Sequence, residues 1–279
     1  NQKTVVIGTN QNPYSECDVK SLIDEGGFLA RRRTGGGAVY HDLGNLNFSF
    51  VADKEIYDVK RQMTVIQKAL LNYGLETEVS GRNDITYQGR KFSGNAFAKT
   101  KHQGLHHGTI LIKTDGEKLQ RYLKVKPAKL HKHGVKSVAS RVINLSEVAD
   151  ITSENIIPHL IKAFEEVYQG KAKTIDFNEL CSDEVARQSQ YIGSDEYLYG
   201  KWKEFNTKKN ATFDWGSVEI DIDIDENKGI IKNINIASDS LDPASINLAI
   251  EILKDASIHD KPIFPNDNII VRDIVEMIY

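Results

Sequence analysis

The sequence predicts an α+β protein with a large domain over residues 1–203 and a small one over residues 204–279. Three observations predict this. The 279-residue chain is long for one ordinary domain and short for three. Long amphipathic helices flank a strand-rich stretch in the first part. In the tail, apolar and acidic residues alternate, which is typical of an antiparallel hairpin with one solvent-facing side.

The first part begins with short elements around a glycine run. In chain order we predict a buried strand at residues 4–8, an amphipathic helix at 15–25, strands at 28–32, from 38 and at 46–51, and a helix at 56–73. The last helix has a continuous apolar stripe, and Gly74 stands where a C-terminal cap belongs.

A β-rich stretch follows, and then two more helices. Gln88-Gly89 predicts a hairpin turn between strands at residues 84–87 and 90–97. We also predict a strand at 109–113 and helices at 153–168 and 179–191. Pro158 lies near the first turn of the former helix, where proline costs little.

The tail has the pattern of an independent module. Val218, Ile220, Ile222 and Ile224 alternate with acidic residues, and a turn at 227–229 leads to a returning strand at 230–236. Helices at 243–255 and 268–278 would cover the apolar face of this hairpin. We place the boundary near residues 199–205.

Composition and charge exclude several protein classes. Apolar residues make up 40% and charged residues 27%, as in globular proteins rather than disordered or disulfide-rich ones. No apolar run approaches the ~20 residues that cross a bilayer. Residues 204–279 carry 7 Lys/Arg against 15 Asp/Glu, which leaves an excess of basic residues before them. These are either two separately solvated surfaces or a sign that the first part binds an anion. No basic stripe interleaved with aromatics indicates nucleic-acid binding.

The run Arg-Arg-Arg-Thr-Gly-Gly-Gly at residues 31–37, followed by His41 and Asp42, departs from ordinary strand packing. Three consecutive glycines weaken a strand and lose backbone entropy. Close approach of backbone N–H groups to a ligand would explain them, and the arginines would add forked donors for phosphate or carboxylate. A flexible hairpin tip beside a solvated basic run is the alternative. The flanking Arg and His-Asp residues favour a binding site.

Two polar segments follow. Asn83-Asp84 is either a simple turn or a ligand-facing amide beside a carboxylate that holds a metal or a lysine. Lys91 lies on a strand whose following residues include Ser93, Gly94 and Ala96, and these small side chains leave space for a ligand.

His106 and His107 are adjacent on a predicted strand and therefore point to opposite faces. They do not form a two-ligand metal site by themselves, and no third ligand has suitable spacing. We therefore reject a structural zinc site.

Together these segments resemble the motifs of lipoate–protein ligases. The family patterns R-R-x-T/S-G-G-G-x-V-x-H-D, N-D, K-apolar-S-G-x-A, H-H-G-T and S-V-x-S-R-V-x-N-L match residues 31–42, 83–84, 91–96, 106–109 and 137–145 in this order. The match in order and spacing extends from about residue 4 to 190. The resemblance implies a large mixed-sheet catalytic domain of the biotin/lipoate ligase type with flanking helices, followed by a small α+β accessory domain.

The resemblance implies a two-step reaction. Lipoate and ATP give lipoyl-adenylate and pyrophosphate, and the lipoyl group then passes to a lysine of a carrier domain in 2-oxoacid dehydrogenases or the glycine cleavage H protein. Lys91 would be catalytic, since an ammonium group between a carboxylate and a phosphate lowers their repulsion. Magnesium would neutralise the phosphates, with Asp84 as the candidate ligand.

The resemblance also implies the remaining site residues. Contacts to ATP or the adenylate are expected from Arg32, Gly37, Ala38, Val39, Tyr40, Asn83, Asp84, Thr109, Ser137, Ser140 and Arg141. Contacts to lipoate are expected from Gly35, Gly36, Gly37, His41 and Lys91. Residues 133–140 match a loop that closes over the adenylate, with Ala139 where many relatives carry arginine.

Charge and cysteine patterns also predict partners and cellular location. The lysines at 124, 126, 129, 132 and 136 are either a solvated face or a surface that steers an acidic carrier domain. We expect a monomer without nucleic-acid or membrane partners. Cys17 and Cys181 lack metal or CxxC spacing, which favours a reducing, cytoplasmic setting. Relatives begin with a strand and a helix that this sequence lacks ahead of residue 1.

Three rival functions stay open. A lipoyl or octanoyl transferase of the same superfamily would need a cysteine nucleophile beside an activating group, and neither Cys17 nor Cys181 is near the Lys91 motif. A biotin ligase would carry a different glycine–arginine loop. A non-catalytic lipoate- or adenylate-binding protein would keep the binding residues without turnover.

Overall fold

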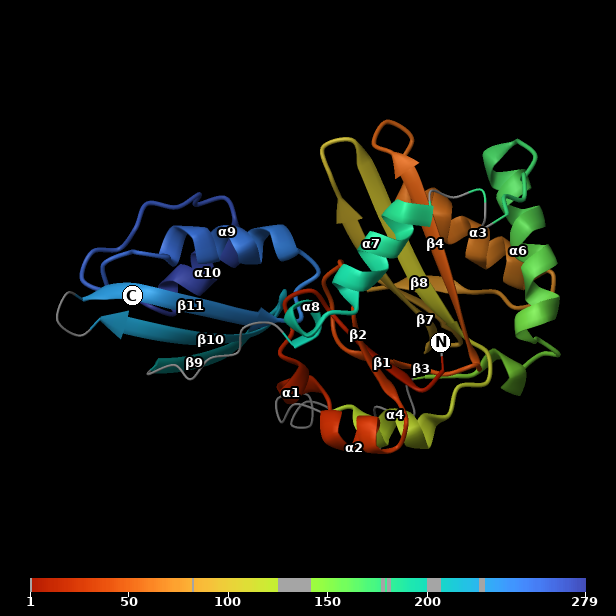
Figure 1. Cartoon of the computed structure of the whole chain (residues 1–279). Coiled ribbons are helices and arrows are strands. Elements are labelled where there is room, and N and C mark those ends of the chain that lie inside the picture. The colour runs from red at the N-terminus through yellow and green to blue at the C-terminus, as the bar shows by residue number, and fades with distance from the viewer. Residues whose placement is uncertain are drawn as a thin grey trace.

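The computed structural model describes residues 2–81, 83–124, 142–176, 179, 182–199, 207–225 and 229–279. It has a larger body, which carries the elements from β1 to α8, and a smaller body, which carries β9 to α10 (Figure 1). The predicted α+β class is confirmed.

The larger body is built on an antiparallel five-stranded sheet with the order β4-β8-β7-β6-β5. Its strands are β4 (Asn45–Asp53), β5 (Glu78–Ser80), β6 (Asp84–Tyr87), β7 (Arg90–Lys99) and β8 (Gln103–Leu111). The predicted β6–β7 hairpin is confirmed, and its turn residues Gln88 and Gly89 have φ of 49° and 72°. This left-handed pair matches the right-handed twist of the strands.

Helices α3 (Val59–Leu71) and α6 (Ser153–Tyr168) cover one face of this sheet (Figure 1). Ile66 and Leu70 of α3 and Ile156 of α6 pack on Phe92 and Ile110 of the sheet, all with at most 1% exposure. Helix α3 begins after Asp58, whose side chain accepts a hydrogen bond from Arg61 N at 3.0 Å. The apolar stripe thus places the core on this face and leaves the other face of the sheet to a second layer.

The second layer is a three-stranded mixed sheet, β2-β1-β3, made of β1 (Thr4–Ile7), β2 (Phe28–Arg31) and β3 (Val39–His41). Strand β1 pairs parallel to β2 and antiparallel to β3. Short helices α1 (Pro13–Glu16), α2 (Val19–Asp24) and α4 (Gly116–Tyr122) lie beside it (Figure 1).

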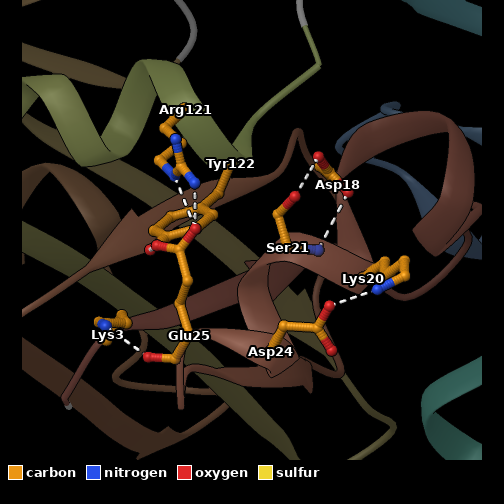
Figure 2. A network of polar contacts seen from close by, with 8 residues as sticks. All are labelled: Lys3, Asp18, Lys20, Ser21, Asp24, Glu25, Arg121 and Tyr122. Carbon is orange, nitrogen blue, oxygen red and sulfur yellow. Dashed lines mark hydrogen bonds and ion pairs between the residues drawn. The ribbon is translucent and has the colours of Figure 1, made fainter.

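Glu25, just after α2, ties this helix to α4 (Figure 2). Its carboxylate accepts hydrogen bonds from Arg121 Nε at 2.9 Å and from the Tyr122 hydroxyl at 2.5 Å. The ring of Tyr122 is fully buried against Tyr40. These contacts fix β3, and with it the end of the glycine run.

The smaller body is an antiparallel sheet, β9 (Thr207–Phe213), β10 (Gly216–Asp225) and β11 (Ile230–Ser238), in the order β11-β10-β9. Helices α9 (Pro243–Leu253) and α10 (Ile269–Glu276) pack on its apolar face, where Ile220, Ile246 and Ile274 are fully buried. This confirms the alternating hairpin and the covering helices. The division of the chain at residues 203 and 204 stays a prediction, and the expected turn at 227–229 lies largely outside the described residues.

The smaller body touches the glycine run of the larger one. Gly36 N donates a hydrogen bond to Ser240 O at 2.8 Å, and Ser238 N donates one to Asn10 O at 2.8 Å. A Cβ on Gly35 would overlap with Ser240 O. At least one of the three glycines is therefore required by a contact between the two bodies.

Several element predictions were wrong. The single helix expected at 15–25 is two helices, because Cys17 is extended and pairs with Leu123 while Asp18 caps α2 through Ser21 N at 3.2 Å. The helix expected from residue 56 starts at Val59, and Ile56 is exposed. Strand β8 is longer than predicted. Strands β5 and β9 and helices α4 and α8 (Asp195–Tyr199) had not been predicted, and the helix expected at 179–191 is α7, Ser182–Ile192.

Within the described part of the chain, no helix has the length and apolar character needed to cross a membrane.

Candidate active site

A cavity of about 450 Å³ lies between the two sheets of the larger body. The five-stranded sheet contributes the face opposite α3 and α6, including His107 and Thr109, and the small sheet contributes Val6, Val39 and His41. The full lining is Val6, Arg32, Gly36, Gly37, Ala38, Val39, His41, Asn47, Phe48, Ser49, Asn83, Lys91, Gly94, Asn95, Ala96, His107, Gly108 and Thr109. Segments that are far apart in the sequence therefore converge on one space.

Lys91 reaches this cavity because of a β-bulge. On β6 the residue opposite Gly94 is Asp84 and the residue opposite Lys91 is Thr86, so one extra residue, Phe92, stands between the two pairs. Without the bulge, Lys91 and Gly94 would point to opposite faces, since they are three residues apart. With it, the Lys91 side chain shares the cavity face with Gly94, and Phe92 is fully buried in the core behind the sheet.

Asp84 and Gly94 hold the Lys91 ammonium group in place. Lys91 Nζ lies 2.7 Å from Asp84 Oδ1, and both side chains are about one-third exposed. A Cβ on Gly94 would lie 3.0 Å from both Cε and Nζ of Lys91. The lysine thus lies flat across the glycine, and its amine is directed by a carboxylate rather than free in solvent.

We expect Gly94→Ala to slow the adenylate formation that the family resemblance implies by about 10–100-fold, since a misplacement of about 1 Å at a reacting group has costs of this order. The new methyl group would push the end of the lysine away from Asp84, and this end is flexible, so the fold should tolerate it. The measurement is pyrophosphate release together with the midpoint of urea unfolding. Gly116→Ala is the matched control, because no heavy atom lies within 4 Å of its new Cβ. A Gly94→Ala variant with full activity would contradict the proposed tight packing.

The Arg32 side chain donates hydrogen bonds to main-chain oxygens of the glycine run. Its Nη2 donates to Gly35 O and Gly37 O, both at 2.8 Å, its Nε donates to Gly35 O at 3.2 Å, and its Nη1 donates to Val6 O at 3.2 Å. Burial lowers the pKa of the guanidinium to about 10, so it stays charged at neutral pH. Four of its five N–H groups therefore hold protein carbonyls.

The neighbouring arginines have other roles. Arg31 donates to main-chain oxygens of both the 8–11 turn and α8, including Gln11 O at 2.7 Å and Leu198 O at 2.6 Å. Arg33 is exposed and contacts Gln188 of α7. Neither lines the cavity, so only one arginine of the run reaches it.

Two imidazoles line the cavity in the neutral form. His41 is 6% exposed, and burial together with the nearby Arg32 guanidinium lowers its pKa to about 4. The same two causes lower the pKa of His107 to about 4, and His107 Nε2 lies 2.7 Å from Thr34 Oγ1. At pH 7 the described lining of the cavity therefore has the positive charges of Arg32 and Lys91, while His41 and His107 are uncharged.

We expect the stability of the protein to fall as the pH drops from about 6.5 to about 4. An unfolded histidine binds its proton near pH 6.5, whereas native His41 binds it only near pH 4. Between these values the unfolded state holds more protons, so acid favours unfolding. The expected loss from His41 is on the order of 1–3 kcal/mol.

The measurement is urea unfolding of wild type and His41→Gln at pH 7 and pH 5. Carboxylates titrate in both proteins, so their contributions cancel in the comparison. The variant should lose less stability than wild type between the two pH values. Equal losses would show that His41 is not held neutral by the fold.

The structure brings most of the predicted site residues together. Arg32, Gly36, Gly37, Ala38, Val39, His41, Asn83, Lys91 and Thr109 line the cavity. Asp84 lies behind Lys91, Gly35 lies against Ser240, and the Tyr40 side chain is buried beside Tyr122. Ser137, Ser140 and Arg141, with the expected loop at 133–140, lie outside the described residues.

Other lining residues were not predicted, although strand alternation indicates some of them. Asn47 and Ser49 pair with Thr109 and His107 across β4 and β8, so they share the cavity face with these residues. Val6 and Phe48 carry no comparable signal. Val6 supplies an apolar part of the lining, whereas the Phe48 ring packs against His106 on the opposite face of the sheet. The described lining thus combines apolar side chains with the cations of Arg32 and Lys91.

Comparisons with known proteins agree with this geometry. Residues 1–165 match the family model "Lipoyl protein ligase A/B catalytic domain", and residues 203–263 match "Bacterial lipoate protein ligase C-terminus". The chain is 40% identical over 263 residues to lipoate-protein ligase A of Bdellovibrio bacteriovorus, which covers 91% of this chain and 77% of that protein.

Three solved structures are also similar. P. falciparum LipL1 in complex with lipoate has a TM-score of 0.85 and 34% identity over all of this chain and 84% of that one. The bipartite lipoate protein ligase of Thermoplasma acidophilum, described with its E2 lipoyl domain, has a TM-score of 0.63 and 30% identity over 74% of this chain and 84% of that one. A lipoate-protein ligase A bound with ATP has a TM-score of 0.61 and 29% identity over 72% and 83% of the two chains.

Proposed function

The chain belongs to the lipoate–protein ligase family, and from this premise we propose how its cavity carries out the reaction. The protein is an ATP-dependent lipoate–protein ligase, which activates lipoate with ATP and transfers the lipoyl group to an acceptor protein. The observation that supports the site assignment is the position of Lys91, whose amine shares one cavity with the glycine run.

Lys91 acts on the first step. A carboxylate oxygen of lipoate forms a bond to the α-phosphorus of ATP, and the bond from that phosphorus to the bridging oxygen breaks, so that pyrophosphate leaves. Two anions must approach each other, and an ammonium group beside both reduces their repulsion and stabilises charge on the transferred group. A compact charge on a flexible stem suits a target that moves during the reaction. Asp84 keeps this amine directed into the cavity.

Magnesium-bound ATP is the nucleotide that we propose. Magnesium usually takes one or two carboxylates together with phosphate oxygens and water. The Asp84 carboxylate is partly exposed and so could bind a metal ion. One of its oxygens, Oδ1, already lies 2.7 Å from Lys91 Nζ. When bound, the metal would neutralise phosphate charge, and Asp84 is the residue that would hold it.

The cavity lining suggests separate places for the two substrates. We assign the lipoyl tail to the apolar wall of Val6, Val39 and Ala96, with Gly36, Gly37 and His41 beside it. We assign ATP to Arg32, to the backbone at Gly37, Ala38 and Val39, and to Asn83 and Thr109. Tyr40 would contribute only through its backbone, and Gly35 only through the shape of the loop. Ser137, Ser140 and Arg141 remain proposed adenylate contacts.

The acceptors that we propose are lipoyl carrier domains of 2-oxoacid dehydrogenases and the glycine cleavage H protein. Acidic carriers would be steered by the basic run that begins at Lys124, which would make the rate sensitive to salt. We also propose a monomer that works in the cytoplasm, as the lack of CxxC or metal-type cysteine spacing suggests.

The transferase alternative needs a reactive thiol, and Cys17 does not supply one. It is 1% exposed in the core beside the small sheet, and burial, with the nearby Asp18 carboxylate, raises its pKa to about 11. A nucleophilic cysteine needs the opposite shift. Cys181 lies outside the described residues.

The test is incubation of the protein with lipoate, magnesium-ATP and a purified lipoyl domain, followed by measurement of the acceptor mass. We expect one lipoyl addition that requires all three components. Octanoate in place of lipoate would measure chain selectivity. An acceptor whose mass does not change, under conditions where the protein is folded, would overturn the ligase assignment.

A further inference from the structure

His106 is a fully buried polar side chain directly behind the cavity floor. It has 0% exposure and lies on the face of β8 opposite to His107. The rings of Phe97, Phe48 and Phe50 surround it, with centroids 4.9, 5.5 and 5.7 Å from that of the imidazole. A polar group in such an apolar site is costly unless its hydrogen bonds are made.

Its hydrogen bonds lead back to the cavity. His106 Nε2 lies 2.8 Å from Asn95 Oδ1, and Asn95 Nδ2 donates to Asn83 O at 3.0 Å. Asn95 N also donates to Asn83 O at 2.9 Å, and Asn83 Nδ2 donates to Asn95 O at 2.7 Å. Three hydrogen bonds thus fasten Asn83, a cavity-lining residue, to Asn95, and His106 fixes the carboxamide that makes one of them.

The direction of these hydrogen bonds is assigned from the partners of each group. Burial lowers the pKa of His106 to about 4, so the ring carries one proton at neutral pH. Because the Asn95 amide nitrogen is engaged with Asn83 O, its oxygen faces the ring, and the proton must lie on Nε2. Nδ1 is then an acceptor. It lies 3.0 Å from Gln62 Oε1 of α3, and exchanging the oxygen and nitrogen of this carboxamide, which are assigned from their partners, places an NH₂ donor there.

Gly108 belongs to the same arrangement. A Cβ there would lie 2.5 Å from Asn95 Oδ1 and 2.5 Å from Phe48 Cζ, so only glycine leaves room for the carboxamide to reach His106. Successive residues of the His-His-Gly-Thr sequence therefore act on opposite faces of the sheet. His107 and Thr109 face the cavity and His106 faces the core, while Gly108, which also borders the cavity, leaves room on the core side for Asn95.

We propose that His106 is a positioning residue for ATP, which acts through Asn95 to fix Asn83 and the adjoining Asp84 at the cavity. This inference rests on the proposed role of Asn83 in nucleotide binding. Phenylalanine at 106 would fill the aromatic site but donate no hydrogen bond. The Asn95 carboxamide would then turn, and Asn83 would lose one of its three restraints.

The experiment compares wild type, His106→Phe and His106→Gln in the full chain by steady-state pyrophosphate release and urea unfolding. We expect His106→Phe to stay folded, with KM for ATP raised about tenfold and KM for lipoate within twofold of wild type. His106→Gln keeps an N–H donor and should restore KM for ATP to within about threefold. His102→Phe, at an exposed turn, is the matched control.

A second readout separates this inference from the proposed function. The ¹H–¹⁵N side-chain amide signals of Asn83 and Asn95 should shift in His106→Phe and not in His102→Phe, whether or not the protein turns over. An inactive wild type would overturn the proposed function alone. An active wild type with unchanged KM for ATP and unchanged amide signals in His106→Phe would overturn the positioning role. Equal rises in both KM values that follow a loss of stability would also overturn it.

Discussion

Lys91→Ala should abolish lipoyl-adenylate formation, with a loss of at least 10²–10³-fold in the rate of pyrophosphate release. Among the described residues that line the cavity, Arg32 and Lys91 are the cationic groups, and Arg32 has four of its five N–H groups engaged with main-chain oxygens. The Lys91 ammonium instead contacts the Asp84 carboxylate and faces the cavity. Its loss would leave the approaching carboxylate and phosphate without their counter-charge and would also leave Asp84 as an additional anion nearby.

The fold should survive this change, because Lys91 is partly exposed and its ion pair is not buried. Lys99→Ala is the matched control, since Lys99 is an exposed lysine at the end of the same strand. Lys91→Arg should recover little activity, because the planar fork does not fit between Gly94 and Asp84 as the ammonium does. Full pyrophosphate release by Lys91→Ala would contradict the mechanism. Lipoate binding without turnover in wild type would favour a non-catalytic binding protein.

Sequence motifs predicted which residues gather at the site, but not how Lys91 comes to face it. Along a regular strand, Lys91 and Gly94 point to opposite sides, and the bulge at Phe92 changes this. A bulge depends on how two strands pair and on which side chain packs into the core. Phe92 fills the core beneath Ile85, and this packing is a tertiary property that local spacing does not contain.

The glycine run shows a similar division. The sequence indicated a close approach of backbone to a ligand, and Gly36 and Gly37 do line the cavity. Yet Gly35 is required by Ser240, about 200 residues later, and Gly36 has φ of 93° with Arg32 Nη2 beside it. Contacts between distant parts of the chain leave no local signal, so the pattern predicted a site but not the reason for each glycine.

Local capping overrode periodicity in the first helix. The apolar residues between 15 and 25 follow a helical period, but Asp18 caps a new helix and Cys17 pairs with Leu123 instead. The spacing of apolar residues carries no sign of this break, whereas Asp18 is itself a typical N-cap residue and signals a new helix start. The sequence did predict the long helices α3 and α6, because each combines a continuous apolar stripe with a clear N-cap.

Arg32→Ala should remove both activity and stability, with a loss of roughly 3 kcal/mol in the free energy of unfolding. The guanidinium satisfies the carbonyl oxygens of Gly35, Gly37 and Val6 at once, and no alanine can replace these hydrogen bonds. Removing it would take away the donors for these carbonyl oxygens and the side chain that holds Gly35 and Gly37 together. Urea unfolding and pyrophosphate release measure the two effects.

Arg32→Lys tests the geometry directly. A single ammonium keeps the charge but cannot reach three carbonyls arranged around a planar fork, so we expect at most partial recovery of stability. Arg33→Ala is the matched control, since Arg33 is exposed one residue further along and should change stability by less than about 0.5 kcal/mol. If Arg32→Ala retained wild-type stability and lost only ATP affinity, the guanidinium would act on the nucleotide alone. If Arg32→Lys behaved as wild type, charge and not the forked hydrogen bonding would be what the loop requires.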